Sequence, residues 1–273
     1  MLTLLTGPDR TALSQALVQR LTDRAKAGEG GQVLLVPEQF SHEAERRLCQ
    51  AGGDSISRYA EVLSFSRLWD RVAAQCGGAA RAYLDQGGRL IAMALAAEQT
   101  ASRIKFFGAS LRRAEFLAEL VSMTEEFQSY CLSPATLSEA AARAEGTFAQ
   151  KLTELALLYE SYLAVTAQGA ADPAGKLSAL ADRLLETDWA AGRTFYVDGF
   201  SDFTAAEARV LESLLRCGRG LTVALATGAA ESAVTRPARE TAKALRLLAA
   251  RWEMPVKTEP VSQCQPRHPA VQA

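Results

Sequence analysis

Short apolar runs that alternate with helical stretches are the feature that most constrains the fold of this 273-residue chain. A run of four or five apolar residues is typical of a strand that is covered on both faces. Strands that alternate with helices indicate a parallel sheet with helices on its faces, so the sequence predicts an α/β fold. The expected strands are 2–6, 32–36, 56–64, 194–198 and 221–225, and the expected helices between and after them are 11–27, 42–50, 65–75, 205–216 and 239–252.

This alternation is interrupted from about residue 84 to residue 185, where no strand is evident. Apolar residues recur there at helical spacing, as in 111–130 and 150–167. Ser133 before Pro134 is typical of a helix start. We therefore expect a discontinuous α/β domain with a large all-helical insertion. The expected boundaries are 1–82 and 191–260 for the α/β domain, 83–190 for the insertion, and 261–273 for a linker cut short within a longer protein.

Composition argues against several functional classes. The 30 Lys and Arg residues nearly balance 31 Asp and Glu residues, so DNA contact would require a local basic patch. The five cysteines form no CxxC pair, which predicts reduced thiols and no metal site. No apolar run approaches the roughly 20 residues of a membrane span, and Met1–Thr6 lacks the basic start of a signal peptide. We expect a soluble cytoplasmic protein.

The segment 195–204 carries the strongest functional pattern. Asp198 is expected at the carboxyl end of a buried strand, where nucleotide-binding α/β proteins place an aspartate directed at Mg²⁺. A capping box from Thr204 to Glu207 then opens a helix. The helicase form of this motif reads Asp-Glu-x-Gln-Asp, and its glutamate positions the attacking water. Gly199 stands in the place of that glutamate, so the sequence predicts a nucleotide-binding scaffold without this acid.

The turn after the first expected strand lies where a phosphate-binding loop belongs. Such a loop reads G-x-x-x-x-G-K-[ST]: its backbone N–H groups and lysine hold phosphate, and its hydroxyl binds Mg²⁺. Gly7 and Thr11 remain, Arg10 takes the place of the lysine, and the middle of the loop is missing. Two interpretations stay open. The segment is a tight turn in which Asp9 caps the next helix, or it is a reduced anion site that holds Mg-ATP together with Asp198.

Two further strand ends carry residues suited to single-stranded DNA. Gln39 lies in a polar loop after the second expected strand, where it could contact a phosphate or a base. After the third, Phe65 offers a ring for base stacking, and Ser66 and Arg67 offer groups for a phosphate or a base edge. The alternative is that Gln39 and Arg67 are merely solvated and that Phe65 belongs to the core.

The densest basic segment is 103–113, which Phe106 and Phe107 interleave. This pattern suits a nucleic-acid surface, although short basic segments also solvate the ends of helices.

These pieces occur in an order that resembles the N-terminal helicase-like region of the AddB family, the B subunit of the bacterial AddAB helicase–nuclease (RexB in some lineages). The resemblance covers roughly residues 1 to 230. The segments that carry it are Leu34-Leu-Val-Pro-Glu-Gln-Phe-Ser41, Val62-Leu-Ser-Phe-Ser-Arg-Leu68, Tyr83-Leu-Asp85 with Gly87, Ser133-Pro134, and Val197-Asp-Gly-Phe-Ser-Asp-Phe-Thr204.

The resemblance implies a RecA-like, P-loop NTPase-type domain 1A and a helical domain 1B. It also implies a heterodimer with an AddA-type subunit that resects double-strand breaks for recombinational repair. The helicase-like part of AddB takes part in recognising the Chi sequence in single-stranded DNA and does not drive translocation. The iron–sulphur nuclease domain of the family lies far beyond this segment, so we expect neither nuclease activity nor a cluster here.

Two departures from the family concern the site. Relatives often carry a phosphate loop of the form G-x-x-G-x-G-K-T, where this chain has only Gly7 to Thr11. Asp70 stands where many relatives have an aromatic residue, with Trp69 shifted by one position. We expect a DNA-binding scaffold that does not hydrolyse ATP. An active ATPase or kinase with an unusual loop and a pure subunit-interaction module are the alternatives.

Overall fold

The structure is a computed structural model that describes residues 1–77, 82–228 and 232–262. Most of the expected linker, with Cys264, lies outside these ranges. The chain divides into two compact units. The sheet unit comprises Met1–Gly77, Leu180–Phe203 and the described residues from Glu207 onward, and the helical unit comprises the described residues from 82 to 179 with Thr204–Ala206.

The sheet unit contains a six-stranded sheet in which every pairing is parallel, in the order β3-β2-β4-β5-β1-β6. This confirms the predicted α/β class and its parallel sheet. The strands are β1 (Leu2–Gly7), β2 (Gln32–Leu35), β3 (Ala60–Leu63), β4 (Thr194–Val197), β5 (Gly220–Ala226) and β6 (Val256–Pro260).

Two strands differ from the sequence-based expectation. The third expected strand is shorter than 56–64, because residues Asp54–Arg58 form a 3₁₀ turn, η2, before β3 begins at Ala60. The strand β6 was not predicted at all. It pairs only with β1 at the sheet edge and most of its residues are exposed, so it lacks the apolar run that marks a buried strand.

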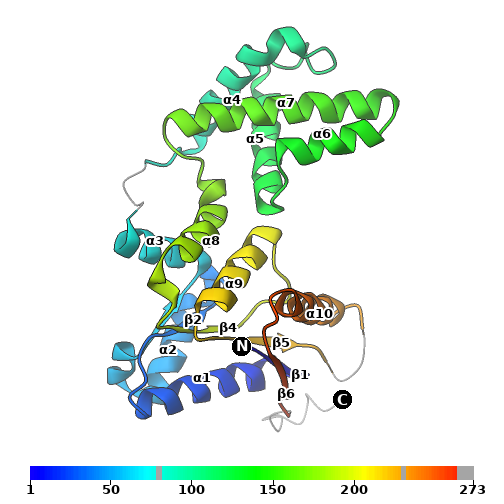
Figure 1. The fold of residues 1–273 in the computed structure, drawn as a ribbon. Helices are drawn as coiled ribbons and strands as arrows, with labels where there is room; N and C mark the ends of the chain where they lie inside the picture. The colour runs from blue at the N-terminus through cyan, green and yellow to red at the C-terminus, as the bar shows by residue number, and fades with distance from the viewer. Residues whose placement is uncertain (78–81, 229–231, 263–273) are drawn as a thin grey trace, which may run out of the picture. The chain divides into compact units, whose positions relative to one another are not determined.

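The helices of the sheet unit include α1 (Arg10–Lys26), α2 (Ser41–Gly52), α3 (Phe65–Cys76), α9 (Ala205–Cys217) and α10 (Arg236–Arg251). From β1 to β3 the chain moves across the sheet in one direction, and from β3 to β6 it moves back in the other. Right-handed crossovers then place α1 and α2 on one face and α9 and α10 on the other, as Figure 1 shows.

The core of the α1–α2 face explains why these segments form amphipathic elements. Leu13, Leu17 and Leu21 recur at helical spacing along α1 and are almost completely buried. They belong to one cluster with Leu34 of β2 and Tyr196 of β4. Burial of such side chains contributes about 1.5–3 kcal/mol each, so this packing fixes the first turn of α1 against the sheet.

The helical unit is built from α4 (Gln86–Thr100), α5 (Ala114–Ser129), α6 (Pro134–Arg143) and α7 (Gly146–Gln168). One apolar cluster joins α4, α5 and α7 through residues such as Met93, Leu120 and Leu158. Between residues 84 and 185 no strand occurs in the described chain, as predicted; one isolated bridge joins Tyr83 to Ala171. The predicted helix start at Ser133 is also confirmed, since its Oγ accepts from the Thr136 N–H at 3.1 Å.

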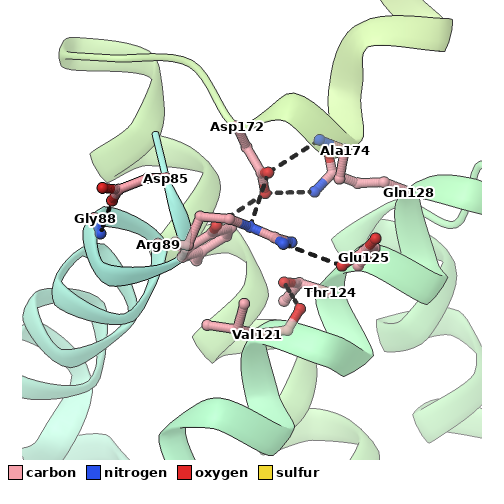
Figure 2. Close-up of polar contacts among 10 residues, drawn as sticks. Asp85, Gly88, Arg89, Val121, Thr124, Glu125, Gln128, Asp172 and Ala174 are labelled. Carbon is pink, nitrogen blue, oxygen red and sulfur yellow. Dashed lines mark hydrogen bonds and ion pairs between the residues drawn. The ribbon is translucent and has the colours of Figure 1, made fainter. Parts of the chain in front are cut away.

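A buried carboxylate, Asp172, holds the end of the helical unit together (Figure 2). It accepts hydrogen bonds from the Tyr162 hydroxyl at 2.8 Å and the Gln128 side-chain amide at 3.0 Å. The Arg89 Nε lies 3.1 Å from its Oδ1, and an Arg89 Nη lies 3.0 Å from Glu125. Burial raises the pKa of Tyr162, so this hydroxyl stays protonated and can donate to the carboxylate.

After α7, the chain passes through η4 (Pro173–Gly175) and α8 (Lys176–Glu186) into the sheet unit. Two further 3₁₀ turns, η3 (Ala101–Arg103) and η5 (Asp188–Ala190), follow α4 and precede β4. Within the described ranges, no helix combines the length and apolar character needed to cross a membrane.

Candidate functional site

The candidate site lies in the sheet unit at the carboxyl ends of β1, β2 and β4. The connections after β1 and β4 leave toward opposite faces of the sheet there, and in open α/β sheets such switch points form the crevices that bind ligands. A cavity of about 150 Å³ occupies this place, and a second of about 230 Å³ lies on the β5 side. Arg10, Asp198 and Gly199 line both cavities.

Asp198 directly follows β4, and its backbone N–H donates to the Leu35 carbonyl at 3.0 Å. Burial raises the pKa of its carboxyl group, although a hydrogen bond from Ser14 and the charges of Arg10 and Arg47 act in the opposite direction. A partly buried carboxylate between two arginines, in a cleft, is the kind of group that marks functional sites.

Arg10, the residue at the lysine position of the predicted loop, turns toward the end of β4. One of its guanidinium nitrogens donates to the Gly199 carbonyl at 2.7 Å. The same guanidinium lies over the Phe40 ring, 5.0 Å from its centroid. The Arg10 guanidinium, at the position of the lysine that binds phosphate in such loops, therefore interacts with groups of the protein.

The predicted loop from Gly7 to Thr11 is a tight turn into α1. Asp9 caps that helix, because its Oδ1 accepts from the Thr11 N–H at 2.8 Å. A Cβ at position 7 would lie 2.6 Å from the Val261 carbonyl oxygen, so glycine is required there by close approach of the chain after β6. The Arg10 guanidinium and the Thr11 N–H are thus both engaged by groups of the protein itself.

Gly199 has a positive φ of 89°, a conformation that favours glycine. A Cβ there would lie 3.0 Å from an Arg10 guanidinium nitrogen and 3.0 Å from Pro37 Cδ. A side chain at position 199 would therefore be strained by the backbone conformation and would require its neighbours to shift.

The four residues predicted to contact DNA lie on two neighbouring elements. Gln39 is exposed in the 3₁₀ turn η1 (Glu38–Phe40), after β2. Ser66 and Arg67 are exposed in the first turn of α3, and Arg67 forms an ion pair with Glu45 at 2.8 Å. Phe65 is only 7% exposed, and its ring packs edge-on against Phe200 at 5.6 Å. Stacking of a base on Phe65 would thus require its covering residues to move.

Sequence reasoning missed several residues that line the site. Ser14 lies one turn of α1 after Arg10 and is buried. The sequence indicated this residue only weakly, as a polar side chain on the apolar face of the helix. Arg47 and Glu43 of α2 form an ion pair one helical turn apart and line the same cavity. Their proximity to Asp198 depends on the order of the strands, which the sequence pattern does not contain.

No metal centre is evident among the described residues. They include no group of three or more His, Cys, Asp or Glu side chains placed to hold a metal ion. The four described cysteines, Cys49, Cys76, Cys131 and Cys217, are free thiols.

Comparison with known proteins gives a consistent result. The family model described as "ADDB, N-terminal" matches residues 4–271. A protein named as the B subunit of an ATP-dependent helicase/deoxyribonuclease, from Pelotomaculum thermopropionicum, is 35% identical over 240 residues, which cover 82% of this chain and 20% of that protein. Its namesake from Clostridium tetani is 31% identical over 200 residues, which cover 72% and 17%. The chain thus spans about a fifth of the length of these relatives.

Proposed function

This chain belongs to the family of AddB N-terminal regions, and from that premise we propose that it is the helicase-like part of the B subunit of an AddAB-type helicase–nuclease. In this role it holds single-stranded DNA, including Chi, without hydrolysing ATP. Its partner is an AddA-type subunit, and its setting is the repair of double-strand breaks by recombination in the cytoplasm. The name that the relatives carry, as the B subunit of a helicase/deoxyribonuclease, supports the assembly.

The lack of ATP hydrolysis is supported above all by one contact, the hydrogen bond from Arg10 to the Gly199 carbonyl. It ties the reduced loop after β1 to the residue that stands in place of the catalytic glutamate. Loss of one positioned catalytic group typically lowers a rate by orders of magnitude, and here the loop and the acid are both altered.

A RecA-like ancestry of the sheet unit is part of the proposal. Its support is the all-parallel order of the sheet and the location of Asp198 at the carboxyl end of β4, beside the first turn of α1. On this view Gly7, Arg10, Thr11 and Asp198 are the remains of a Mg-ATP site.

Strand holding is proposed for the exposed residues at the ends of β2 and β3. Gln39, Ser66 and Arg67 are exposed and can reach phosphates or base edges. Phe65, the first residue of α3, is buried and anchors the first turn of that helix. The pair with Glu45 is solvent-exposed and therefore weak, so Arg67 can exchange it for a phosphate.

The test is a pair of measurements on the 273-residue chain: phosphate release from Mg-ATP, and affinity for a single-stranded oligonucleotide. We expect no release above that of the Asp198→Ala variant, and a salt-dependent affinity that falls in the double variant Gln39→Ala/Arg67→Ala. His42→Ala, an exposed change in α2, is the matched control. Turnover that Asp198→Ala abolishes would favour an active ATPase, and no DNA affinity would favour a pure interaction module.

A further inference from the structure

The segment 103–113, called here the basic connection, joins η3 to α5 in the helical unit and has no role in the function proposed above. It contains Arg103, Lys105, Arg112 and Arg113, all exposed, and no acidic residue. Among the described residues, none of these four side chains forms an ion pair. These cations make the segment locally positive in a chain whose net charge is −1, and a local positive segment favours an anionic ligand.

The backbone of the basic connection is fixed in place by a buried carboxylate. Glu154 of α7, only 5% exposed, accepts from the N–H groups of Lys105, Phe106 and Phe107 at 2.9, 2.7 and 3.0 Å. Burial alone would raise the pKa of Glu154, but these backbone hydrogen bonds lower it overall. The carboxylate therefore stays ionised, and its three hydrogen bonds hold the backbone of the basic connection in place.

Apolar anchors and exposed groups alternate along the connection. Ile104 and Leu111 are buried in the cluster of the helical unit, and Phe107 packs against that cluster. Phe106, in contrast, is 42% exposed. It packs edge-on against Phe107 at 5.0 Å, and the Lys151 ammonium lies 4.9 Å from its ring centroid. An aromatic ring is thus exposed to solvent, packed against Phe107 and close to the ammonium group of Lys151.

We propose that the basic connection is a binding surface for single-stranded nucleic acid, with phosphates on its four cations and a base on the Phe106 ring. Unpaired cations together with an exposed aromatic ring are the two components of surfaces that bind single strands without sequence preference. An acidic protein would use the cations but would leave the ring unexplained. This surface lies in the helical unit and does not depend on the strand-end residues of the sheet unit.

The charge component is tested by the salt dependence of oligonucleotide affinity. In the 273-residue chain, the triple variant Lys105→Ala/Arg112→Ala/Arg113→Ala should lower the slope of log affinity against log salt by about 0.7 for each phosphate that is no longer neutralised. Arg143→Ala, which removes an exposed cation without an ion pair on α6, should leave the slope unchanged. An unchanged slope in the triple variant, as expected of a surface that binds an acidic protein, would overturn the proposal.

The stacking component is tested separately at Phe106. Phe106→Leu keeps an apolar side chain but removes the ring, so affinity should fall about 5-fold or more while the salt slope stays the same. Unchanged affinity in a variant with an unchanged circular dichroism spectrum would overturn the role of the ring. If the Gln39→Ala/Arg67→Ala variant keeps full affinity while these variants lose it, the strand-end assignment fails and this one stands.

Discussion

At the scale of single residues, the candidate site centres on Gly199, which follows Asp198 at the end of β4. Gly199 has a left-handed backbone conformation, and its carbonyl accepts from Arg10. Any side chain there would meet Arg10 and Pro37. The same residue therefore disfavours any side chain at this position and ties the first turn of α1 to the end of β4.

Replacement of Gly199 by alanine should destabilise the protein by about 1–3 kcal/mol, because a positive φ is strained for a non-glycine residue and Pro37 has little freedom to retreat. Urea unfolding measures the change. Gly30→Ala is the matched control, since a Cβ at position 30 meets nothing within 4 Å. Equal stability of the two variants would contradict the conformational argument.

Asp198→Asn should stabilise the protein near neutral pH. Burial raises the folded-state pKa of Asp198, so the folded state binds the proton more readily than the unfolded state. The ionised carboxylate then lowers stability as pH rises from the ordinary aspartate range through the raised pKa, and asparagine removes this penalty. Urea unfolding at pH 4 and pH 8 should show a larger advantage of the variant at pH 8. A variant that is less stable than the wild type at pH 8 would contradict the assignment of burial as the dominant cause.

At this scale, sequence reasoning located Asp198 and Gly199, because a strand end can be recognised from a local apolar run. It did not locate Ser14 or Arg47. Their interaction with the carboxylate joins segments more than 150 residues apart, and no local pattern encodes that interaction.

At the scale of elements, a buried glutamate organises a connection that has no regular structure of its own. Glu154 substitutes for the missing hydrogen-bond partners of three successive N–H groups between η3 and α5. This explains why the connection is ordered although it contains four unpaired cations.

Glu154→Gln should destabilise the protein by about 1.5–3 kcal/mol, because an amide can accept with only one oxygen and its NH₂ group opposes a backbone N–H. The folded-state pKa of Glu154 is lowered, so its contribution is fully present above the ordinary glutamate pKa and is lost as pH falls through the lowered value. Thermal unfolding of the variant against the wild type should therefore show a difference that shrinks in acid.

Glu160→Gln, an exposed change on the same helix, is the control for that experiment and should have little effect. A Glu154→Gln variant with the wild-type melting temperature at pH 7 would show that the three N–H groups do not depend on the carboxylate.

The strands that the sequence predicted well are the four inner ones, β1, β2, β4 and β5, whose residues are mostly buried. The two edge strands were predicted less well: β3 reads Ala-Glu-Val-Leu and begins later than expected, and β6 reads Val-Lys-Thr-Glu-Pro and is mostly exposed. One helix begins later than predicted: α5 starts at Ala114 and not near Leu111, because hydrogen-bonded turns occupy the residues before it.

At the scale of the whole molecule, the sheet unit brings together segments of the chain that lie before and after the helical unit in the sequence. The strand order β4-β5-β1 brings the end of β4 near the first turn of α1, and the Arg10–Gly199 hydrogen bond spans 189 positions. Composition and periodicity predicted the parallel sheet but not the order of its strands. The strand order brings Asp198 together with Arg10, Ser14 and Arg47 in the candidate site.

The central claim is that this arrangement holds a strand and does not consume ATP. The most direct measurement is phosphate release from Mg-ATP by the 273-residue chain in the presence of saturating single-stranded DNA, with Asp198→Ala as the reference. The account predicts equal, background release from both proteins while the wild type remains bound to the oligonucleotide. Release by the wild type that the substitution abolishes would contradict it.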